Sequence, residues 1–288
     1  MRFTKMHGLG NDYLYFDGYA ENLDHYDLAE LSRLLSDRHF GVGSDGIILV
    51  LPSDKADFRM RMFNSDGSEG EMCGNGIRCF AKFVYDRGLT TKAQLEVETE
   101  AGIIRPAMTV EDGKVTWVRV DMGQPRLTRG QIPMTGDTEA SAQAVTIELP
   151  GKSYVGHCVS MGNPHCVIFV EEITDAQVLG DGPLLEVHGL FPRKTNVEFA
   201  QVLSPTEVRM RVWERGAGET LACGTGACAT AVAAHLAGYC GREVTVRLRG
   251  GDLRIEWLTD DRVMMTGPAT TVAECEVTED FIAAALRQ

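Results

Sequence analysis

The stretch that decides the fold is RMRMFN at residues 59–64, because the similar stretch RMRVWE occurs 150 residues later, at residues 209–214. A near match at an offset of 152 residues places Gly10-Asn11 over Gly162-Asn163. Further matches at the offset of 150 are Glu69 with Glu219, Cys73 with Cys223, Gly74 with Gly224 and Gly76 with Gly226. Self-similarity at a single period predicts a tandem duplication that gives two halves of one layout.

Both halves contain short β-rich runs that are separated by Gly, Pro, Asp and Asn, the pattern of strands joined by turns. The predicted strands are 46–51, 57–63, 94–98, 115–120, 153–160, 166–170, 197–203, 208–213 and 244–248. A helix is predicted after each shared cysteine. In the first, Ile77, Phe80, Ala81 and Val84 fall at helical spacing and the helix ends near Gly88. The second covers 226–237, which is almost wholly small and apolar and stops at Gly238, and an earlier helix is predicted over 28–38.

These elements predict an α+β fold of two pseudo-symmetric domains, each a curved, mostly antiparallel sheet wrapped around a central helix, with the active site in the cleft between them. The first domain is predicted to cover residues 1–121 and to carry Cys73. The second is predicted to cover residues 122–267 and to carry Cys223, with residues 122–125 as the linker.

Composition excludes several classes of protein. Among the 288 residues, 44% are hydrophobic and 24% charged, which is typical of a globular chain and rules out disorder, collagen and coiled coils. The net charge is −13 and the basic residues are scattered, so no nucleic-acid surface is expected. The longest apolar run, 46–51, is too short to span a membrane, and the first residues lack a signal-peptide core. We therefore expect a cytoplasmic protein whose eight cysteines are reduced thiols.

Cys73 and Cys223 each precede a Gly-x-Gly that opens a predicted helix. The free backbone N–H groups of a helix N-terminus lower the pKa of a thiol placed there and also bind carboxylates. Either cysteine alone fits a buried apolar residue beside a tight turn. Two copies at symmetric positions instead favour a reaction that needs matched acids on both faces of one carbon, namely racemisation or epimerisation at an α-carbon.

Four motifs together resemble the diaminopimelate epimerase family over most of the chain, from Met6 to about Pro268. The motifs are MHGLGND at 6–12, MCGNGIRC at 72–79, SMGNPH at 160–165 and ERGAGETLACGTG at 214–226. The resemblance implies a homodimer that epimerises LL-diaminopimelate to meso-diaminopimelate in lysine and peptidoglycan precursor biosynthesis, with no cofactor. It also implies that the tail, about residues 268–288, packs back on the first domain.

The resemblance further implies the roles of individual residues. Cys73 and Cys223 would be the two acid/base groups, with Cys73 deprotonating the LL isomer and Cys223 serving the reverse direction. The carboxylate at the reacting centre would bind the backbone N–H groups of Gly74, Asn75, Gly224 and Thr225. The remaining substrate contacts would be Asn11, Asn64, Asn163, Asn196, Glu214 and Arg215, and His165 is a further candidate near them. The family pattern also implies a Gln where this chain has Gly46, so one polar contact is either lost or supplied by water.

Two other motifs are rejected and two other functions stay open. The string GVGSDG at 41–46 matches a dinucleotide fingerprint, but a strand-like run follows it where that site needs a helix. The His-Cys pairs at 157–158 and 165–166 fit no common zinc spacing, so no metal is expected. The alternatives are another cofactor-free amino-acid racemase or epimerase, of the proline racemase kind, and a non-enzymatic thiol redox or metal-binding protein.

Overall fold

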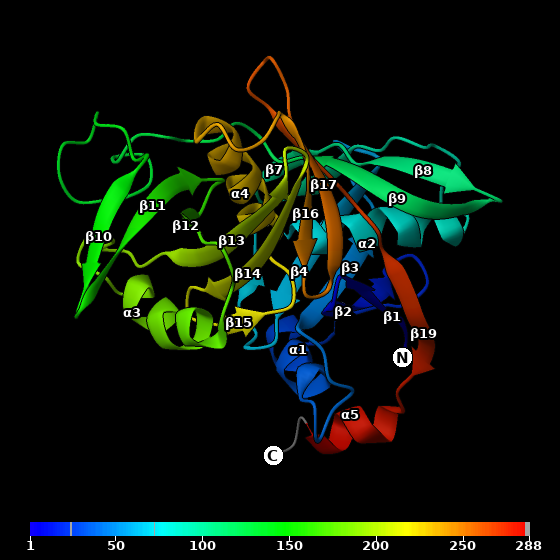
Figure 1. Cartoon of the computed structure of the whole chain (residues 1–288). Helices are drawn as coiled ribbons and strands as arrows, with labels where there is room; N and C mark the ends of the chain where they lie inside the picture. The colour runs from blue at the N-terminus through cyan, green and yellow to red at the C-terminus, as the bar shows by residue number, and fades with distance from the viewer. Residues whose placement is uncertain (24, 72, 286–288) are drawn as a thin grey trace. The chain divides into compact units, whose positions relative to one another are not determined.

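The computed structural model of the chain describes all residues except 24, 72 and 286–288. The chain divides into two compact units (Figure 1). Unit 1 contains Met1–Val120 together with the chain from Gly267 onward, and unit 2 contains Asp121–Thr266. The last three residues of the predicted tail, 286–288, lie outside the described residues. That the units descend from one duplicated ancestor stays a prediction.

Unit 1 is built on a mixed sheet in the order β19-β1-β2-β3-β4-β6-β7, with β5 paired to β4. Its strands are β1 (Arg2–Gly8), β2 (Asn11–Asp17), β3 (Gly46–Leu51), β4 (Phe58–Asn64), β5 (Glu69–Gly70), β6 (Val97–Thr99), β7 (Gly102–Ile104) and β19 (Thr270–Glu276). A further hairpin joins β8 (Ala107–Glu111) to β9 (Lys114–Asp121). The helices are α1 (Leu28–Ser36), α2 (Gly74–Asp86) and α5 (Glu279–Ala285). Strand β19 pairs antiparallel with β1, so a strand from the C-terminal part of the chain forms an edge of the unit 1 sheet.

Helix α2 lies against this sheet and buries the apolar residues that its spacing predicted. Ile77, Phe80, Ala81 and Val84 are all fully buried, and the helix packs against β1, β2, β3 and β19. It ends before Gly88, whose φ of +73° suits glycine. The helix therefore holds its N-terminal residue, Cys73, at one edge of a rigid core.

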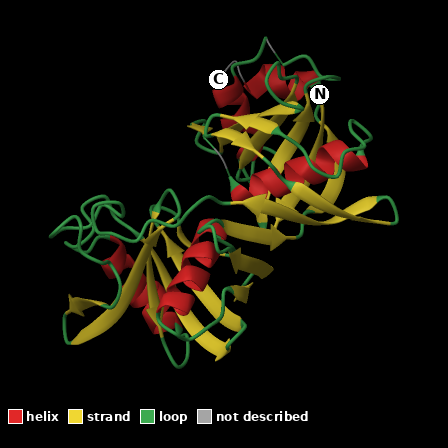
Figure 2. Cartoon of the chain, turned by 90° about the horizontal axis from the view of Figure 1, so that it is seen from above, coloured by secondary structure: helices red, strands yellow, loops and turns green. Residues whose placement is uncertain are grey.

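Unit 2 has the strand order β10-β11-β12-β13-β14-β16-β17-β18, with β15 paired to β14. Its strands are β10 (Val145–Leu149), β11 (Lys152–Ser160), β12 (Pro164–Phe169), β13 (Asn196–Ser204), β14 (Glu207–Glu214), β15 (Gly218–Thr220), β16 (Glu243–Leu248), β17 (Gly251–Trp257) and β18 (Val263–Gly267). The helical segments are the π-helix η1 (Ala176–Asp181), α3 (Gly182–Glu186) and α4 (Gly224–Leu236). Helix α4 packs against β11, β12, β13, β14, β16 and β17, which explains why nearly all its side chains are small and apolar. Figure 2 shows helices lying along the strands of the sheets.

The internal repeat appears in the structure as equivalent contacts. Helices α2 and α4 both have 13 residues and begin 150 residues apart. In unit 1 strand β4 pairs with the short strand β5, and in unit 2 strand β14 pairs with the short strand β15. Each pair of strands also carries an ion pair, Arg61 with Glu69 and Arg211 with Glu219, and in both the Nε and Oε1 atoms lie 2.7 Å apart. The predicted class, α+β with two sheet-and-helix units, is confirmed.

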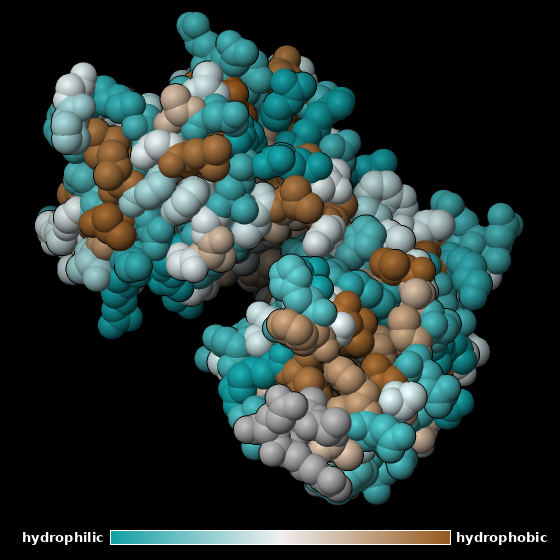
Figure 3. Space-filling view, turned by 90° about the horizontal axis from the view of Figure 1, so that it is seen from below, coloured by the Kyte–Doolittle hydropathy of each residue, from teal (hydrophilic) through white to brown (hydrophobic). Residues whose placement is uncertain are grey.

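The face drawn in Figure 3 is mainly polar, and its apolar side chains form separate patches. Within the described part of the chain, we find no helix long and apolar enough to cross a membrane.

Candidate active site

Cys73 is the N-cap residue of α2, and its side chain takes part in the cap. Its backbone is extended, with φ −131° and ψ 121°, and its Sγ accepts the N–H of Gly76 at 3.4 Å. The Sγ also lies 3.4 Å from Asn11 Oδ1, to which the thiol donates. A Cβ at Gly76 would lie 2.9 Å from Cδ1 of the fully buried Ile48, so a larger residue here would require the Ile48 side chain to move.

Cys223 occupies the equivalent N-cap of α4, with φ −124° and ψ 109°, but its surroundings differ. Its Sγ lies 3.5 Å from Thr225 Oγ1. A Cβ at Gly226 would lie 3.2 Å from Cys223 Sγ and 2.7 Å from Glu198 Oε1, so a buried carboxylate stands beside the first turn of α4. The matching position in unit 1 is the apolar Ile48.

Burial raises the pKa of the Cys73 thiol, and this rise is reduced by the N–H groups of Gly76 and Asn75 and by the Arg78 guanidinium. Burial raises the pKa of Cys223 well above its ordinary value, and the carboxylates of Glu214 and Glu198 raise it further. The lowered pKa predicted from the helix N-termini is therefore wrong for both thiols, because burial outweighs the helix N–H groups. The two thiols are also unequal, because the carboxylates of Glu214 and Glu198 add to the rise at Cys223, whereas the N–H groups and the guanidinium described around Cys73 oppose the rise there.

In unit 1 the structure brings Asn11, Cys73 and Asn75 together. Asn11, the first residue of β2, accepts from the Cys73 thiol and from Asn75 Nδ2 at 3.3 Å. Asn64, the last residue of β4, instead donates to Ser68 Oγ at 3.0 Å and is joined to neither cysteine by a described hydrogen bond. Gly74 begins α2, as the predicted carboxylate site requires.

In unit 2 the predicted residues Asn163 and His165 form one chain of contacts with Glu198, which was not predicted. Asn163 Oδ1 lies 3.0 Å from His165 Nε2, and His165 Nδ1 lies 2.6 Å from Glu198 Oε1. His165 and Glu198 are fully buried, and the second oxygen of Glu198 has no hydrogen-bond partner among the described residues. His165 pairs in register with Asn196 on the next strand.

Asn196 uses both ends of its amide on backbone groups. Its Nδ2 donates to Pro164 O and its Oδ1 accepts the N–H of Arg215, both at 2.8 Å. In this arrangement Asn196 positions the turn that carries Arg215. Glu214, the residue before, accepts from the Thr220 hydroxyl, and its pKa is raised because it is buried.

Gly46, where the family resemblance leads us to expect a glutamine, has a strained and crowded backbone. Its φ is +154°, and a Cβ there would lie 2.1 Å from the carbonyl oxygen of Phe63. A side chain therefore does not fit this backbone without a shift of the chain.

Sequence reasoning missed two residues beside these groups. Asp45 binds Asn11 and lies in the glycine-rich string that was considered only as a nucleotide motif. Glu198 lies beside Cys223 and is a charged residue inside an apolar strand, a signal that the sequence contained.

The fold is shared with solved structures of other proteins. A probable proline racemase from Agrobacterium radiobacter K84 matches with a TM-score of 0.69 and 18% identity, covering 97% of this chain and 93% of that one. A hydroxyproline epimerase from Agrobacterium vitis matches with a TM-score of 0.67 and 16% identity, covering 96% and 90%. At these identities the likeness concerns the fold alone.

Sequence comparison is more specific. The profile described as "Diaminopimelate epimerase" matches residues 3–128 and 157–272. The diaminopimelate epimerase of Moorella thermoacetica is 59% identical over 273 residues, covering 94% of this chain and 97% of that protein. That of Methanococcus maripaludis strain S2 is 55% identical over 280 residues, covering 96% and 99%. The chain belongs to the diaminopimelate epimerase family, whose members are isomerases acting on an amino-acid α-carbon.

Proposed function

We propose that the chain interconverts LL- and meso-diaminopimelate without a cofactor, using Cys73 and Cys223 as its two acid/base groups. The thiolate of one cysteine removes the α-proton from one face, and the thiol of the other delivers its own proton to the opposite face. Each turnover therefore exchanges the protonation states of the two cysteines. The observation that carries this proposal is the occurrence of a cysteine at the equivalent N-cap of α2 and of α4 in a member of this family.

The carbanion formed in this step needs stabilisation, which we assign to the first turns of the two helices. Gly74-Asn75 and Gly224-Thr225 stand at those turns, where backbone N–H groups lack helical partners and attract a carboxylate. Negative charge that develops on the carboxylate oxygens during proton removal would be held by these donors.

The distal amino-acid end of diaminopimelate needs a second set of contacts. Arg215 suits its carboxylate because the guanidinium binds with two parallel N–H groups, and Glu214 suits its ammonium group. Asn64 and Asn163 complete the proposed contacts. Asn196 supports them by holding the backbone N–H of Arg215.

The family resemblance supports a direction for each thiol, with Cys73 as the base and Cys223 as the acid in the LL to meso direction. The carboxylates of Glu214 and Glu198, which raise the pKa of Cys223 further than burial alone, favour the protonated form that this acid role needs. The resemblance alone supports a homodimer in the cytoplasm. Sedimentation analysis of the purified chain would test the dimer.

The test is incubation with LL-diaminopimelate in D₂O, following isomer composition and α-deuterium together. Product should carry solvent deuterium while unreacted substrate initially carries little, because each thiol acts on one face. Cys73→Ala and Cys223→Ala should each lose activity by about 10²-fold or more. Cys275→Ala in unit 1 and Cys240→Ala in unit 2 are the matched controls and should remain active.

Substantial activity in either of the first two variants would contradict the two-thiol mechanism. Comparable turnover of proline would favour the other racemase class instead, because proline has no distal amino-acid end for Glu214 and Arg215 to bind.

A further inference from the structure

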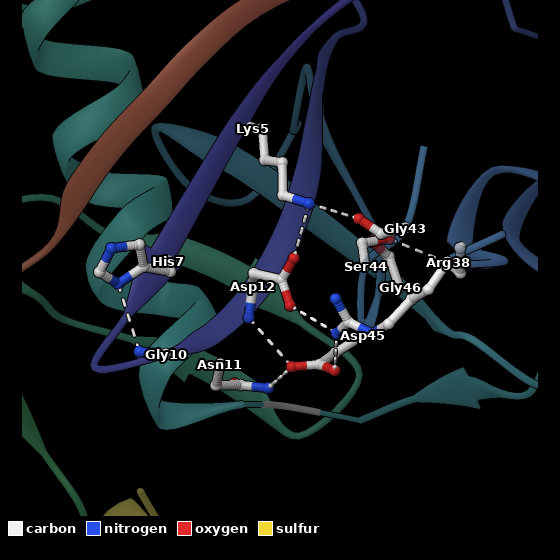
Figure 4. Close-up of polar contacts among 11 residues, drawn as sticks. Lys5, His7, Gly10, Asn11, Asp12, Arg38, Gly43, Ser44, Asp45 and Gly46 are labelled. Atoms are coloured by element: carbon white, nitrogen blue, oxygen red, sulfur yellow. Dashed lines mark hydrogen bonds and ion pairs between the residues drawn. The ribbon is translucent and has the colours of Figure 1, made fainter. Parts of the chain in front are cut away.

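The amide of Asn11 is held at its nitrogen end by Asp45. Figure 4 shows the Asp45 carboxylate beside Asn11, and Asp45 Oδ2 accepts from Asn11 Nδ2 at 2.7 Å and from the N–H of Asp12 at 3.0 Å. Its Oδ1 accepts from Arg38 at 2.9 Å. A carboxylate can only accept hydrogen bonds, so the nitrogen of Asn11 must face Asp45 and the oxygen must face away from it.

The oxygen end is fixed from the opposite side by a cation. Arg78, which is fully buried, donates to Asn75 Oδ1 at 2.9 Å, and Asn75 Nδ2 donates to Asn11 Oδ1 at 3.3 Å. A guanidinium can only donate, so it sets the orientation of Asn75, which then sets that of Asn11. The hydrogen bonds run in one direction, from Arg78 through the two amides to Asp45.

We infer that Asp45 is a positioning residue for Cys73: it locks the Asn11 amide so that the oxygen, and not the nitrogen, faces the Cys73 thiol. The glycine-rich segment 41–46 thus has a structural role, because it places the Asp45 carboxylate beside the first residues of β2. Gly43 contributes by accepting from Lys5 Nζ, and Lys5 also pairs with Asp12 at 2.9 Å. The inference rests on the proposed function of Cys73 as an acid/base group.

The lock has a chemical consequence at the sulfur. An acceptor that faces Sγ stabilises the thiol relative to the thiolate, whereas an N–H in the same place would do the opposite. A thiol kept at a higher pKa yields a stronger base once it loses its proton, which suits removal of a weakly acidic α-proton. The other ionisable groups around Cys73 are Tyr13, Tyr15, Arg78 and Cys79.

The decisive variant is Asp45→Asn, in which one amide oxygen must serve three donors, from Asn11, Asp12 and Arg38. Arg38 attracts that oxygen most strongly, which turns the new NH₂ toward Asn11 and releases the lock. The readout is the pH profile of alkylation by iodoacetamide, followed for each cysteine by peptide mass spectrometry. Trypsin cleaves after Arg78, so the peptides of Cys73 and Cys79 are measured separately.

We expect Asp45→Asn to shift the Cys73 alkylation profile to lower pH by about one unit, the size of a single changed hydrogen bond and charge. The profile of Cys223 should not move. The acidic limb of kcat/KM for epimerisation should shift in the same direction. Asn11→Ala should abolish the effect, so that adding Asp45→Asn to it gives little further shift, a double-mutant test of action through Asn11.

Two controls separate the lock from a general effect of charge. Glu30→Gln removes an equal charge from the surface of α1, where Glu30 pairs with Arg33. Asp12→Asn removes a carboxylate that shares Arg38 with Asp45 but does not touch the Asn11 side chain. Both should leave the Cys73 profile nearly unchanged. If Asp45→Asn does not fold, Asp45→Thr replaces it, because unit 2 carries Thr195 at the position 150 residues later.

The inference is overturned if the Cys73 profile does not move, if it moves equally in the Asn11→Ala background, or if Cys223 moves with it. Alkylation needs no substrate, so this test remains valid whether or not diaminopimelate is turned over. If the wild-type chain lacks epimerase activity but Asp45→Asn still shifts the alkylation profile of Cys73 as expected, only the proposed function is contradicted.

Discussion

At the scale of single residues, the proposed site depends on contacts between residues that lie far apart in the chain. Cys73 and Cys223 could be predicted because the repeat aligns them, and the asparagines because their motifs are distinctive. Asp45 lies 34 residues from its partner Asn11, and Glu198 lies 33 residues from His165. Contacts over such separations depend on strand pairing, which local sequence patterns do not specify.

Gly46 gives a prediction at this scale. Gly46→Ala should lower the free energy of unfolding by at least about 2 kcal/mol, because it adds both an unfavourable φ and a Cβ that meets Phe63 O. Gly113→Ala is the matched control, since its φ is +74° but a Cβ there would meet nothing within 4 Å. That control should cost about 1 kcal/mol. Urea denaturation measures both, and equal losses would show that the contact with Phe63 is unimportant.

At the scale of elements, the two helices that follow the shared cysteines were predicted well, whereas some strands were missed. Helices α2 and α4 have strong apolar patterns, a cap and a following glycine. Strand β2 was missed because it is buried on both faces, so its buried and exposed residues do not alternate. Strand β17 was also missed, although its buried and exposed residues do alternate. A strand was predicted over residues 94–98, but the observed strand β6 begins at Val97. Gln94 lies outside it and forms an isolated bridge with Ala107.

The repeated elements also show where the two units differ chemically. Strand β3 places Ile48 under the first turn of α2, and β13 places Glu198 under the first turn of α4. At the offset of 152, Tyr13 corresponds to His165. An apolar residue and a phenol in unit 1 are thus replaced by a buried carboxylate and an imidazole in unit 2, so one architecture gives two thiols of different acidity.

Glu198→Gln tests this difference. The Glu198 carboxylate raises the pKa of Cys223, so its removal should lower that pKa and shift the alkylation profile of Cys223 to lower pH. Glutamine keeps an acceptor for His165, which limits structural damage. The alkylation profile of Cys73 in the same sample is the internal control and should stay in place. A Cys223 profile that does not move would mean that Glu198 has no influence on the thiol.

At the scale of the whole molecule, the proposed mechanism requires both sulfurs to reach one α-carbon, each at a contact of about 3–3.5 Å. The structure describes all eight cysteines as free thiols. An S–S bond is about 2.05 Å long, so thiols that work on opposite faces of one carbon need only a modest approach to join. The chain should therefore be inactivated by an intramolecular disulfide between Cys73 and Cys223.

Peroxide should abolish activity, dithiothreitol should restore it, and a bound substrate analogue should protect by separating the sulfurs. Because the pKa of both thiols is raised, oxidation should be slow near neutral pH and should accelerate as the pH rises and thiolate forms. Peptide mapping under non-reducing conditions identifies the linked pair. Cys158 and Cys166 are the demanding control, since they face each other on β11 and β12 but are fully buried. If reversible inactivation links that pair, or none, then Cys73 and Cys223 do not act on a single carbon.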